Sequence, residues 1–260
     1  MPTLTFDRHC AEIVAQADAL AGTIAGADLT APVPGCPGWD VGQLLRHLGG
    51  GLRWAEVIVR TRATAPPPDE HFRKVEGGGD PAVLGPWVAA GARQLAATLR
   101  DAGPDATMWT PVPGRTAEFY ARRFAHETVV HRADAALALG AEFALEPEVA
   151  VDGVDEWLEL GSLPQMLELF PERRELLGPG RTLHLHATDA PEELHAEWVV
   201  DLTETLAWRR AHEKAAVAVR GPLTDLLLLV YRRRGLDGAG LEVFGDRALL
   251  ELWLARVAFG

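Results

Sequence analysis

Glu127 and His131 lie four residues apart in one segment of the chain. If this segment is helical, the two side chains project from the same face, one turn apart. A carboxylate and an imidazole at that spacing can bind one metal ion, and zinc accepts both. The pattern is not the His-Glu-x-x-His motif of zinc proteases. Three residues separate the pair, so Glu127 would be a ligand rather than a general base.

His47 is a further candidate ligand, in a second amphipathic segment. It follows Leu44 by three residues and precedes Leu48 by one, so it should face the interior with these apolar side chains. With Glu127 and His131 it would give three nitrogen or oxygen ligands and leave one position free, as in catalytic zinc sites. Each histidine could instead be a core residue satisfied by one hydrogen bond, and for either residue alone that interpretation is favoured.

Glu127 is harder to explain without a metal, because a carboxylate facing a helical core is costly unless it is paired or coordinated. The competing interpretation is an ion pair with Arg123 or Arg132 at the surface. Spacing alone leaves both interpretations open. Asp134, three residues beyond His131, could support the ligands, but we favour a surface ion pair of Asp134 with Arg132.

His184 and His186 alternate in a segment with strand-like patterning, so they should share one face of the strand. They could begin a second metal site. The sequence shows no third ligand close to them, and a half-buried polar face is the favoured interpretation.

The elements that must position the first three residues are helices. Asp40 is a good N-cap, Gln43 stands at the capping-box position, and Trp39 and Leu44 can form a hydrophobic staple. Four helices of roughly 20 residues with two long connections suit a four-helix bundle with crossovers. The predicted helices span residues 5–25, 40–65, 80–100 and 116–139.

The pattern of residue types changes after Gly140. Short segments in which apolar and polar residues alternate, as in strands, are mixed there with helical patterns. We expect an α+β fold with a metal-binding bundle over residues 1–145 and a smaller α+β domain over residues 146–260. Strands are predicted at 181–187, 194–200, 215–219 and 241–244, and helices at 147–160, 223–233 and 246–257.

Composition limits the classes of function. The formal net charge of −12 argues against a nucleic-acid partner bound through phosphate neutralisation. The longest apolar run, Leu226 to Val230, is far shorter than the ~20 residues that span a bilayer. The two cysteines are too few for a disulfide framework, and the N-terminus lacks a signal pattern. We therefore expect a cytoplasmic protein without a membrane partner.

Two stretches together resemble the mycothiol-dependent maleylpyruvate isomerase family. They are Pro34-Gly35-Cys36-Pro37-Gly38-Trp39-Asp40, continued by residues 41–48, and the segment 125–135 that contains Glu127 and His131. The resemblance extends through the later half of the chain and covers almost all of it. The later residues that carry it are 183–189, Trp198, 221–228 and 243–246.

The resemblance implies a DinB-like four-helix bundle followed by a small, sterol-carrier-like α/β domain. It implies a divalent metal, usually zinc, on the residues that match His47, Glu127 and His131, and mycothiol as a thiol cosubstrate. In the isomerase the thiol adds to an activated double bond, rotation follows, and elimination returns the thiol. A catalytic arginine of the C-terminal domain falls within 232–234 here, and Arg233 is the best match.

We therefore expect a metal-dependent, mycothiol-using isomerase or S-transferase that acts on a small electrophile, with its site in a cleft between the domains. A zinc ion with three such ligands stays Lewis acidic and lowers the pKa of a bound thiol. Two alternatives stay open. One is a non-catalytic metal- or ligand-binding protein on the same fold, and the other is a thiol-independent metal hydrolase.

Overall fold

The structure is a computed structural model that describes residues 4–68, 72, 74–77, 79–237 and 240–257. The chain divides into two compact units. The first spans Leu4–Phe143, and the second begins at Ala144. Each unit is described by itself below. No helix among the described residues is long and apolar enough to cross a membrane.

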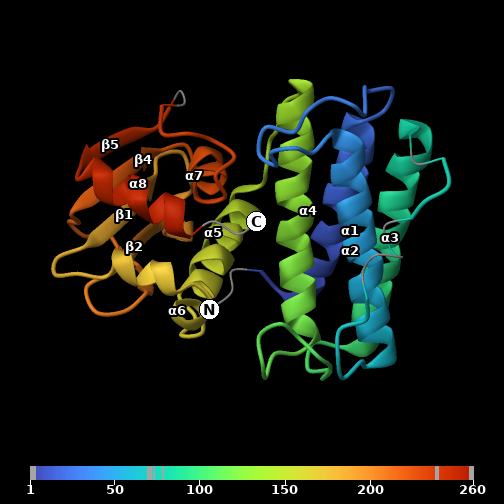
Figure 1. The fold of residues 1–260 in the computed structure, drawn as a ribbon, viewed down its shortest axis with the longest axis horizontal. Coiled ribbons are helices and arrows are strands. Elements are labelled where there is room, and N and C mark those ends of the chain that lie inside the picture. The colour runs from blue at the N-terminus through green and yellow to red at the C-terminus, as the bar shows by residue number, and fades with distance from the viewer. Residues whose placement is uncertain (1–3, 69–71, 73, 78, 238–239, 258–260) are drawn as a thin grey trace. The chain divides into compact units, whose positions relative to one another are not determined.

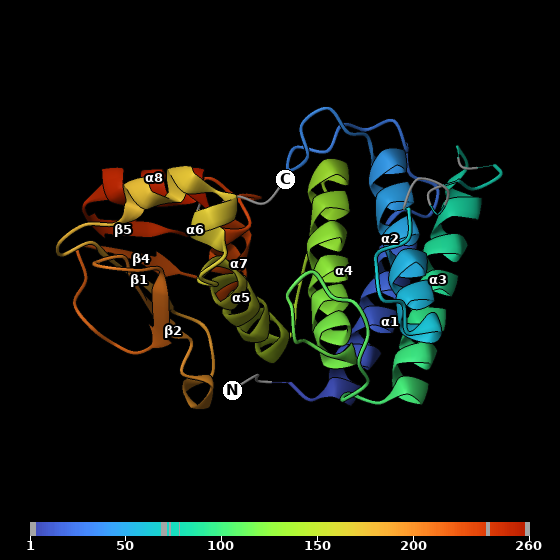
Figure 2. The same cartoon turned by 60° about the horizontal axis from the view of Figure 1, so that its bottom comes forward.

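The described residues of the first unit form a bundle of four helices, α1 to α4, whose arrangement is shown in Figures 1 and 2. Helix α2 packs against α3 and α4, and α1 packs against α3 and α4. Fully buried side chains such as Ile13, Leu45 and Leu95 fill the space between the helices. The bundle consists of α1 (Phe6–Thr23), α2 (Val41–Thr61), α3 (Pro81–Ala102) and α4 (Ala117–Leu139).

The start signals of α2 and α3 and the stop signal of α4 act as the sequence predicts. The side chain of Asp40 accepts a hydrogen bond from the backbone N–H of Gln43, and Gln43 returns one to the Asp40 backbone, which completes the capping box. Asp80 caps α3, and Pro81 occupies its first turn. Gly140 ends α4 with a φ of 64°, a left-handed conformation that glycine adopts without strain.

A close approach between α2 and α3 depends on Gly49. A Cβ at this position would lie 2.1 Å from the nearest ring atom of Trp87. Arg53 restrains the same indole. Its guanidinium lies 4.0 Å from the Trp87 ring centroid and donates a hydrogen bond to the Trp87 backbone carbonyl. Glycine therefore lets the indole pack directly on the backbone of α2.

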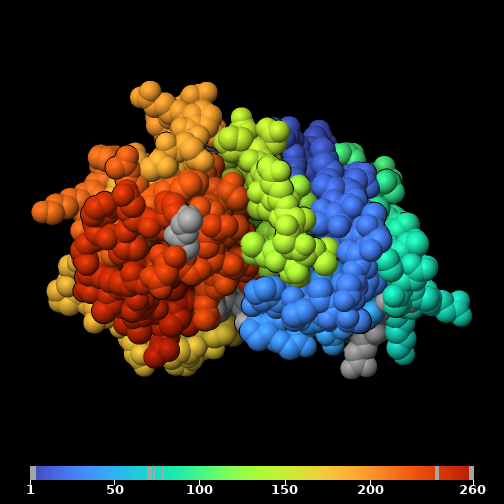
Figure 3. All heavy atoms as spheres, turned by 90° about the horizontal axis from the view of Figure 1, so that it is seen from above, coloured from blue at the N-terminus to red at the C-terminus, as the bar shows by residue number. Residues whose placement is uncertain are grey.

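The connection between α1 and α2 brings part of the chain over the end of the bundle. In Figures 1 and 3 its blue segment adjoins the yellow-green C-terminal half of α4. Cys36 of this connection lies with its Sγ 3.6 Å from Oδ2 of Asp134 on α4. The segment that precedes α2 is thus fixed against the helix that carries Glu127 and His131.

The second unit is an α+β domain built on a five-stranded mixed sheet with the order β3-β2-β1-β4-β5. Strands β1 and β4 are parallel, and the other neighbours are antiparallel. Helix α7 packs on β1 and β4, and α8 packs on β4. The strands are β1 (Thr182–Ala187), β2 (Glu197–Asp201), β3 (Ala207–Arg210), β4 (Val217–Gly221) and β5 (Glu242–Gly245). The helices are α5 (Pro147–Gly161), α6 (Met166–Leu169), α7 (Leu223–Val230) and α8 (Arg247–Arg256), with 3-10 turns η2 (Pro171–Leu176) and η3 (Glu192–Leu194).

The predicted fold class, a helical bundle followed by an α+β domain, is confirmed. Several local details differ. Helix α2 ends at Thr61 rather than at residue 65, because Arg62 adopts a left-handed φ of 52°. The short helix α6 was not expected. Strand β3 was not expected, β2 begins at Glu197 because η3 and the left-handed His195 precede it, and α7 ends at Val230. The helix cannot continue to residue 233 because Arg232 has a φ of 59°.

Candidate metal centre in the helical bundle

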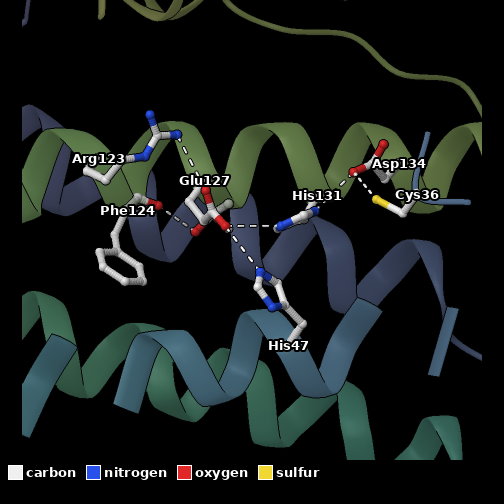
Figure 4. Close-up of polar contacts among 8 residues, drawn as sticks. Cys36, His47, Arg123, Phe124, Glu127, His131 and Asp134 are labelled. Carbon is white, nitrogen blue, oxygen red and sulfur yellow. Dashed lines mark hydrogen bonds and ion pairs between the residues drawn. The ribbon is translucent and has the colours of Figure 1, made fainter. Parts of the chain in front are cut away.

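His47, Glu127 and His131 converge at one place in the bundle. His47 comes from α2, and the other two residues come from successive turns of α4. The Nε2 atoms of His131 and His47 lie 3.1 Å and 3.4 Å from the same oxygen, Oε1 of Glu127 (Figure 4). One ligand atom from each of the three residues lies within 4.8 Å of the others. The structure thus brings together the three residues that the sequence selected.

The separations suit a small divalent cation. Zinc bonds of 2.0–2.1 Å in tetrahedral geometry place neighbouring ligand atoms roughly 3.4 Å apart. The observed 3.1 Å and 3.4 Å need only small adjustments to reach that spacing. The side chains of His47 and Glu127 are 31% and 32% exposed, whereas that of His131 is 8% exposed. The cluster is therefore accessible from one side, as a site that receives a substrate must be.

Asp134 supports this cluster and does not lie at the surface, where we placed it from sequence. Asp134 is fully buried, and its Oδ2 lies 3.0 Å from Nδ1 of His131. A carboxylate bonded to one imidazole nitrogen fixes the tautomer and directs the other nitrogen to the metal. The i, i+3 spacing of His131 and Asp134 is a sequence signal that could have indicated this contact.

The guanidinium of Arg132 lies 4.4 Å from the ring centroid of Phe143.

Arg123 forms an ion pair with Glu127 on the side of the carboxylate that faces away from the two histidines. Its Nη2 lies 3.5 Å from Oε2 of Glu127, and the other carboxylate oxygen faces His47 and His131. The ion pair considered from sequence and the metal cluster are therefore compatible, because they use different oxygens of one carboxylate.

Glu127 and His131 shift each other's pKa. Removal from water would raise the pKa of Glu127, but His131, His47 and Arg123 together hold it well below its usual range. Burial alone would lower the pKa of His131, whereas Glu127 and Asp134 raise it to about 9. Without a metal, an imidazolium thus lies between two carboxylates. A metal ion that binds here must displace that proton.

Trp39 lies against a candidate ligand. We assigned it from sequence to the hydrophobic staple, and it is partly buried against the apolar core that includes Leu44. Its ring centroid also lies 5.0 Å from that of His47. The indole therefore restricts the orientations open to the His47 imidazole.

A cavity of about 510 Å³ adjoins the cluster and includes His47 and Glu127 in its wall. The rest of the wall is largely apolar, with Trp54 and Phe124 as its largest side chains. The indole N–H of Trp54 donates to the carbonyl of Pro67 at 2.9 Å, which holds the segment Pro66–Pro68 against the cavity. A mainly apolar pocket with a few convergent polar groups is the usual form of a small-molecule site.

Arg233, the predicted catalytic arginine, belongs to the second unit and follows the end of α7. Its Nη1 donates to the carbonyl of Tyr231 at 2.8 Å. Its neighbour Arg234 forms an ion pair with Asp225 at 3.2 Å. The catalytic role of Arg233 stays a prediction.

The fold and the site define a class of two-domain proteins, in which a four-helix bundle with a His/Glu/His cluster precedes a small mixed-sheet domain. Residues 10–136 match the mycothiol maleylpyruvate isomerase N-terminal domain, and residues 148–252 match the MDMPI C-terminal domain. The chain belongs to the mycothiol-dependent maleylpyruvate isomerase family.

Two solved structures share the fold over most of their length. The crystal structure of the mycothiol-dependent maleylpyruvate isomerase is 16% identical, with a TM-score of 0.60, over 92% of this chain and 93% of that one. A histidine-to-alanine mutant of that isomerase is 15% identical, with a TM-score of 0.59 and the same coverage. No curated protein matches the sequence.

Proposed function

We propose that this protein is a metal-dependent enzyme that uses the low-molecular-weight thiol mycothiol either to isomerise a small electrophile or to transfer the thiol onto it. One observation carries the proposal: the ligand atoms of His47, Glu127 and His131 converge beside a largely apolar cavity. Family membership supports the choice of thiol.

The donor set fits zinc or a similar divalent cation. Two neutral imidazoles and one carboxylate contribute a single negative charge, so a bound dication would keep a net positive charge. Such an ion supplies Lewis acidity that lowers the pKa of a bound thiol and favours thiolate at neutral pH.

The side chains of the site have separate tasks in this proposal. Asp134 holds the His131 imidazole so that Nε2 faces the cluster, and Arg123 neutralises the outer oxygen of Glu127. The apolar wall around Trp54 and Phe124 would shield the reacting carbon from water on one side. A thiolate formed beside this wall can add to an activated double bond. Rotation and elimination of the thiolate would give isomerisation, whereas protonation of the resulting carbanion, with the new C–S bond kept, would give S-transfer.

Arg233 is proposed to bind a carboxylate of the electrophile. A guanidinium presents paired N–H donors that match a carboxylate in two-pronged geometry. The assignment rests on the family resemblance and needs its own test, which is given in the Discussion.

Thiol-dependent turnover tests the proposed function. Zinc-loaded protein is given mycothiol and a panel of small electrophiles, including maleylpyruvate, and loss of free thiol and formation of product are followed. We expect turnover that requires both thiol and zinc. We also expect it to fall at least about 100-fold in His47→Ala and in Glu127→Gln, because each loses a metal ligand.

Glu118→Gln is the matched control, because Glu118 lies exposed on the same helix and outside the cluster. Its activity should equal that of the wild type. Hydrolysis that proceeds without added thiol would replace the proposal with a metal hydrolase. Stoichiometric binding with no turnover of any electrophile would replace it with a binding protein.

A further inference from the structure

The second unit contains a separate cluster of ligand-type side chains that the proposed reaction does not use. His184, His186, Glu197 and His212 each place one nitrogen or oxygen within 4.8 Å of the others. All four residues belong to the same compact unit. The sequence showed no third ligand near His184 and His186. In the folded unit, Glu197 and His212 lie beside them.

The sheet explains how these residues meet. His184 and His186 lie on one face of β1, two residues apart. Glu197 of β2 stands directly opposite His186 in the antiparallel register, so its side chain projects from the same face. The backbone N–H of Ala211 donates to the Glu197 carbonyl at 3.2 Å, which places His212, just after β3, beside the same carboxylate.

Three imidazoles surround one carboxylate oxygen. Nε2 of His184, Nδ1 of His186 and Nδ1 of His212 lie 2.9, 2.8 and 2.6 Å from Oε2 of Glu197. The ring centroids form a nearly equilateral triangle with sides of 5.8, 5.5 and 5.9 Å. Three imidazoles bound to one tetrahedral zinc ion would have centroids about 5 Å apart, given zinc–nitrogen bonds of 2.0–2.1 Å. The rings are therefore already arranged nearly as a zinc ion requires.

We propose that His184, His186, Glu197 and His212 form a second zinc site, which is structural rather than catalytic. Four protein ligands complete a tetrahedron and leave no position for substrate, as in structural zinc sites. Imidazole and carboxylate donors suit zinc among the common divalent ions, whereas calcium and magnesium prefer oxygen ligands. A zinc ion bound by one carboxylate and three neutral imidazoles would carry a net charge of +1. Because the site is partly exposed, water can stabilise this charge.

The site would join three parts of the chain. His184 and His186 lie on β1, near the centre of the sheet, Glu197 lies on β2, and His212 follows the edge strand β3. The His212 side chain is 77% exposed, whereas that of His184 is 9% exposed. A bound ion would thus fasten an exposed segment to a buried strand, and its removal should loosen the β3 edge.

Zinc titration of a chain without the bundle site tests this inference. The protein carries His47→Ala and Glu127→Gln, has no polyhistidine tag, and is made metal-free before calorimetric titration with Zn²⁺. We expect one equivalent of zinc to bind and to raise Tm. Adding His212→Ala should lower the affinity at least about tenfold and remove the rise in Tm, while circular dichroism stays unchanged because the side chain is exposed.

His195→Asn is the control for adventitious binding to histidine. His195 is an exposed histidine of the same unit, and its left-handed φ of 45° is tolerated by asparagine. This variant should bind zinc like its parent. Equal affinity in the His212→Ala and His195→Asn proteins, or no zinc bound at all, would overturn the second site.

The reciprocal experiment separates this inference from the proposed function. His212→Ala in an otherwise wild-type chain should retain one zinc per chain and full thiol-dependent turnover. Co²⁺ added to the chain without the bundle site should give the strong visible absorption of a tetrahedral ion. A weak octahedral spectrum would contradict a closed site of four protein ligands.

Discussion

Asp134 lies 3.0 Å from Nδ1 of His131, and the opposite nitrogen of the same ring lies 3.1 Å from Glu127. The imidazole is therefore held between two carboxylates of its own helix, at i−4 and i+3. This arrangement fixes which nitrogen is offered to a metal ion. It also explains why a fully buried aspartate is tolerated on α4.

Asp134→Asn should weaken zinc binding at the bundle site by about 10- to 100-fold, because the neutral amide no longer fixes the imidazole tautomer. The measurement is calorimetric titration in a His212→Ala background, where the C-terminal cluster is incomplete. Glu118→Gln, on the same helix, should leave the affinity unchanged. Unaltered affinity in a folded Asp134→Asn protein would show that Asp134 has no positioning role.

Stability of the metal-free protein should fall as pH rises from 6.5 to 9. Folding raises the pKa of His131 from 6.5 to about 9, so the folded state binds the extra proton in this window. The stabilisation is complete below pH 6.5 and is lost as pH passes through 9. It is on the order of 3 kcal/mol at most.

Urea unfolding at a series of pH values measures this dependence. The same series on His131→Gln isolates the contribution of the imidazole from those of other titrating groups. We expect the slope between pH 6.5 and 9 to be shallower in the variant. Parallel curves for the two proteins would exclude a raised pKa at His131.

Arg233→Ala should raise KM for a carboxylate-bearing electrophile by about 10- to 100-fold, the usual strength of a charge-assisted contact. The effect on kcat should be smaller, because the contact is made in both ground and transition states. Arg233→Lys should restore only part of the affinity. Steady-state kinetics with the neutral ester of the same electrophile provides the control, since its KM should not respond. Equal KM values for wild type and Arg233→Ala would remove Arg233 from the site.

Gly49→Ala should destabilise the bundle by about 1–3 kcal/mol through overpacking. The new methyl group would clash with Trp87, and Arg53 hinders the indole from moving away. Gly22→Ala on α1 is the control, because nothing lies within 4 Å of its added Cβ. That variant should gain up to about 1 kcal/mol from helix propensity. Chemical denaturation of both variants checks the difference, and a stabilised Gly49→Ala protein would contradict the close packing.

The sequence could predict what depends on local periodicity. The i, i+4 spacing of Glu127 and His131 fixes their relation as soon as the segment is helical, and the Asp40 capping box sets where α2 begins. These features act within one or two turns, so the pattern of residue types determines them.

The second cluster depends on long-range pairing, which local patterns do not encode. Strand β3 has only four residues, two of them arginines, so it shows neither alternation nor an apolar run. Without β3 in place, nothing in the sequence brings His212 beside His184. Glu197 likewise becomes a neighbour only through the register of β2 on β1.

The cavity wall made by Pro66–Pro68 has a consequence for selectivity. Each proline ring fixes its own φ, and the Trp54 indole ties the Pro67 carbonyl to α2. We expect this part of the pocket to be ordered before a ligand binds, so that binding would cost little free energy for ordering it. Discrimination among electrophiles at this wall would then follow from the fit of their shape to a preformed surface.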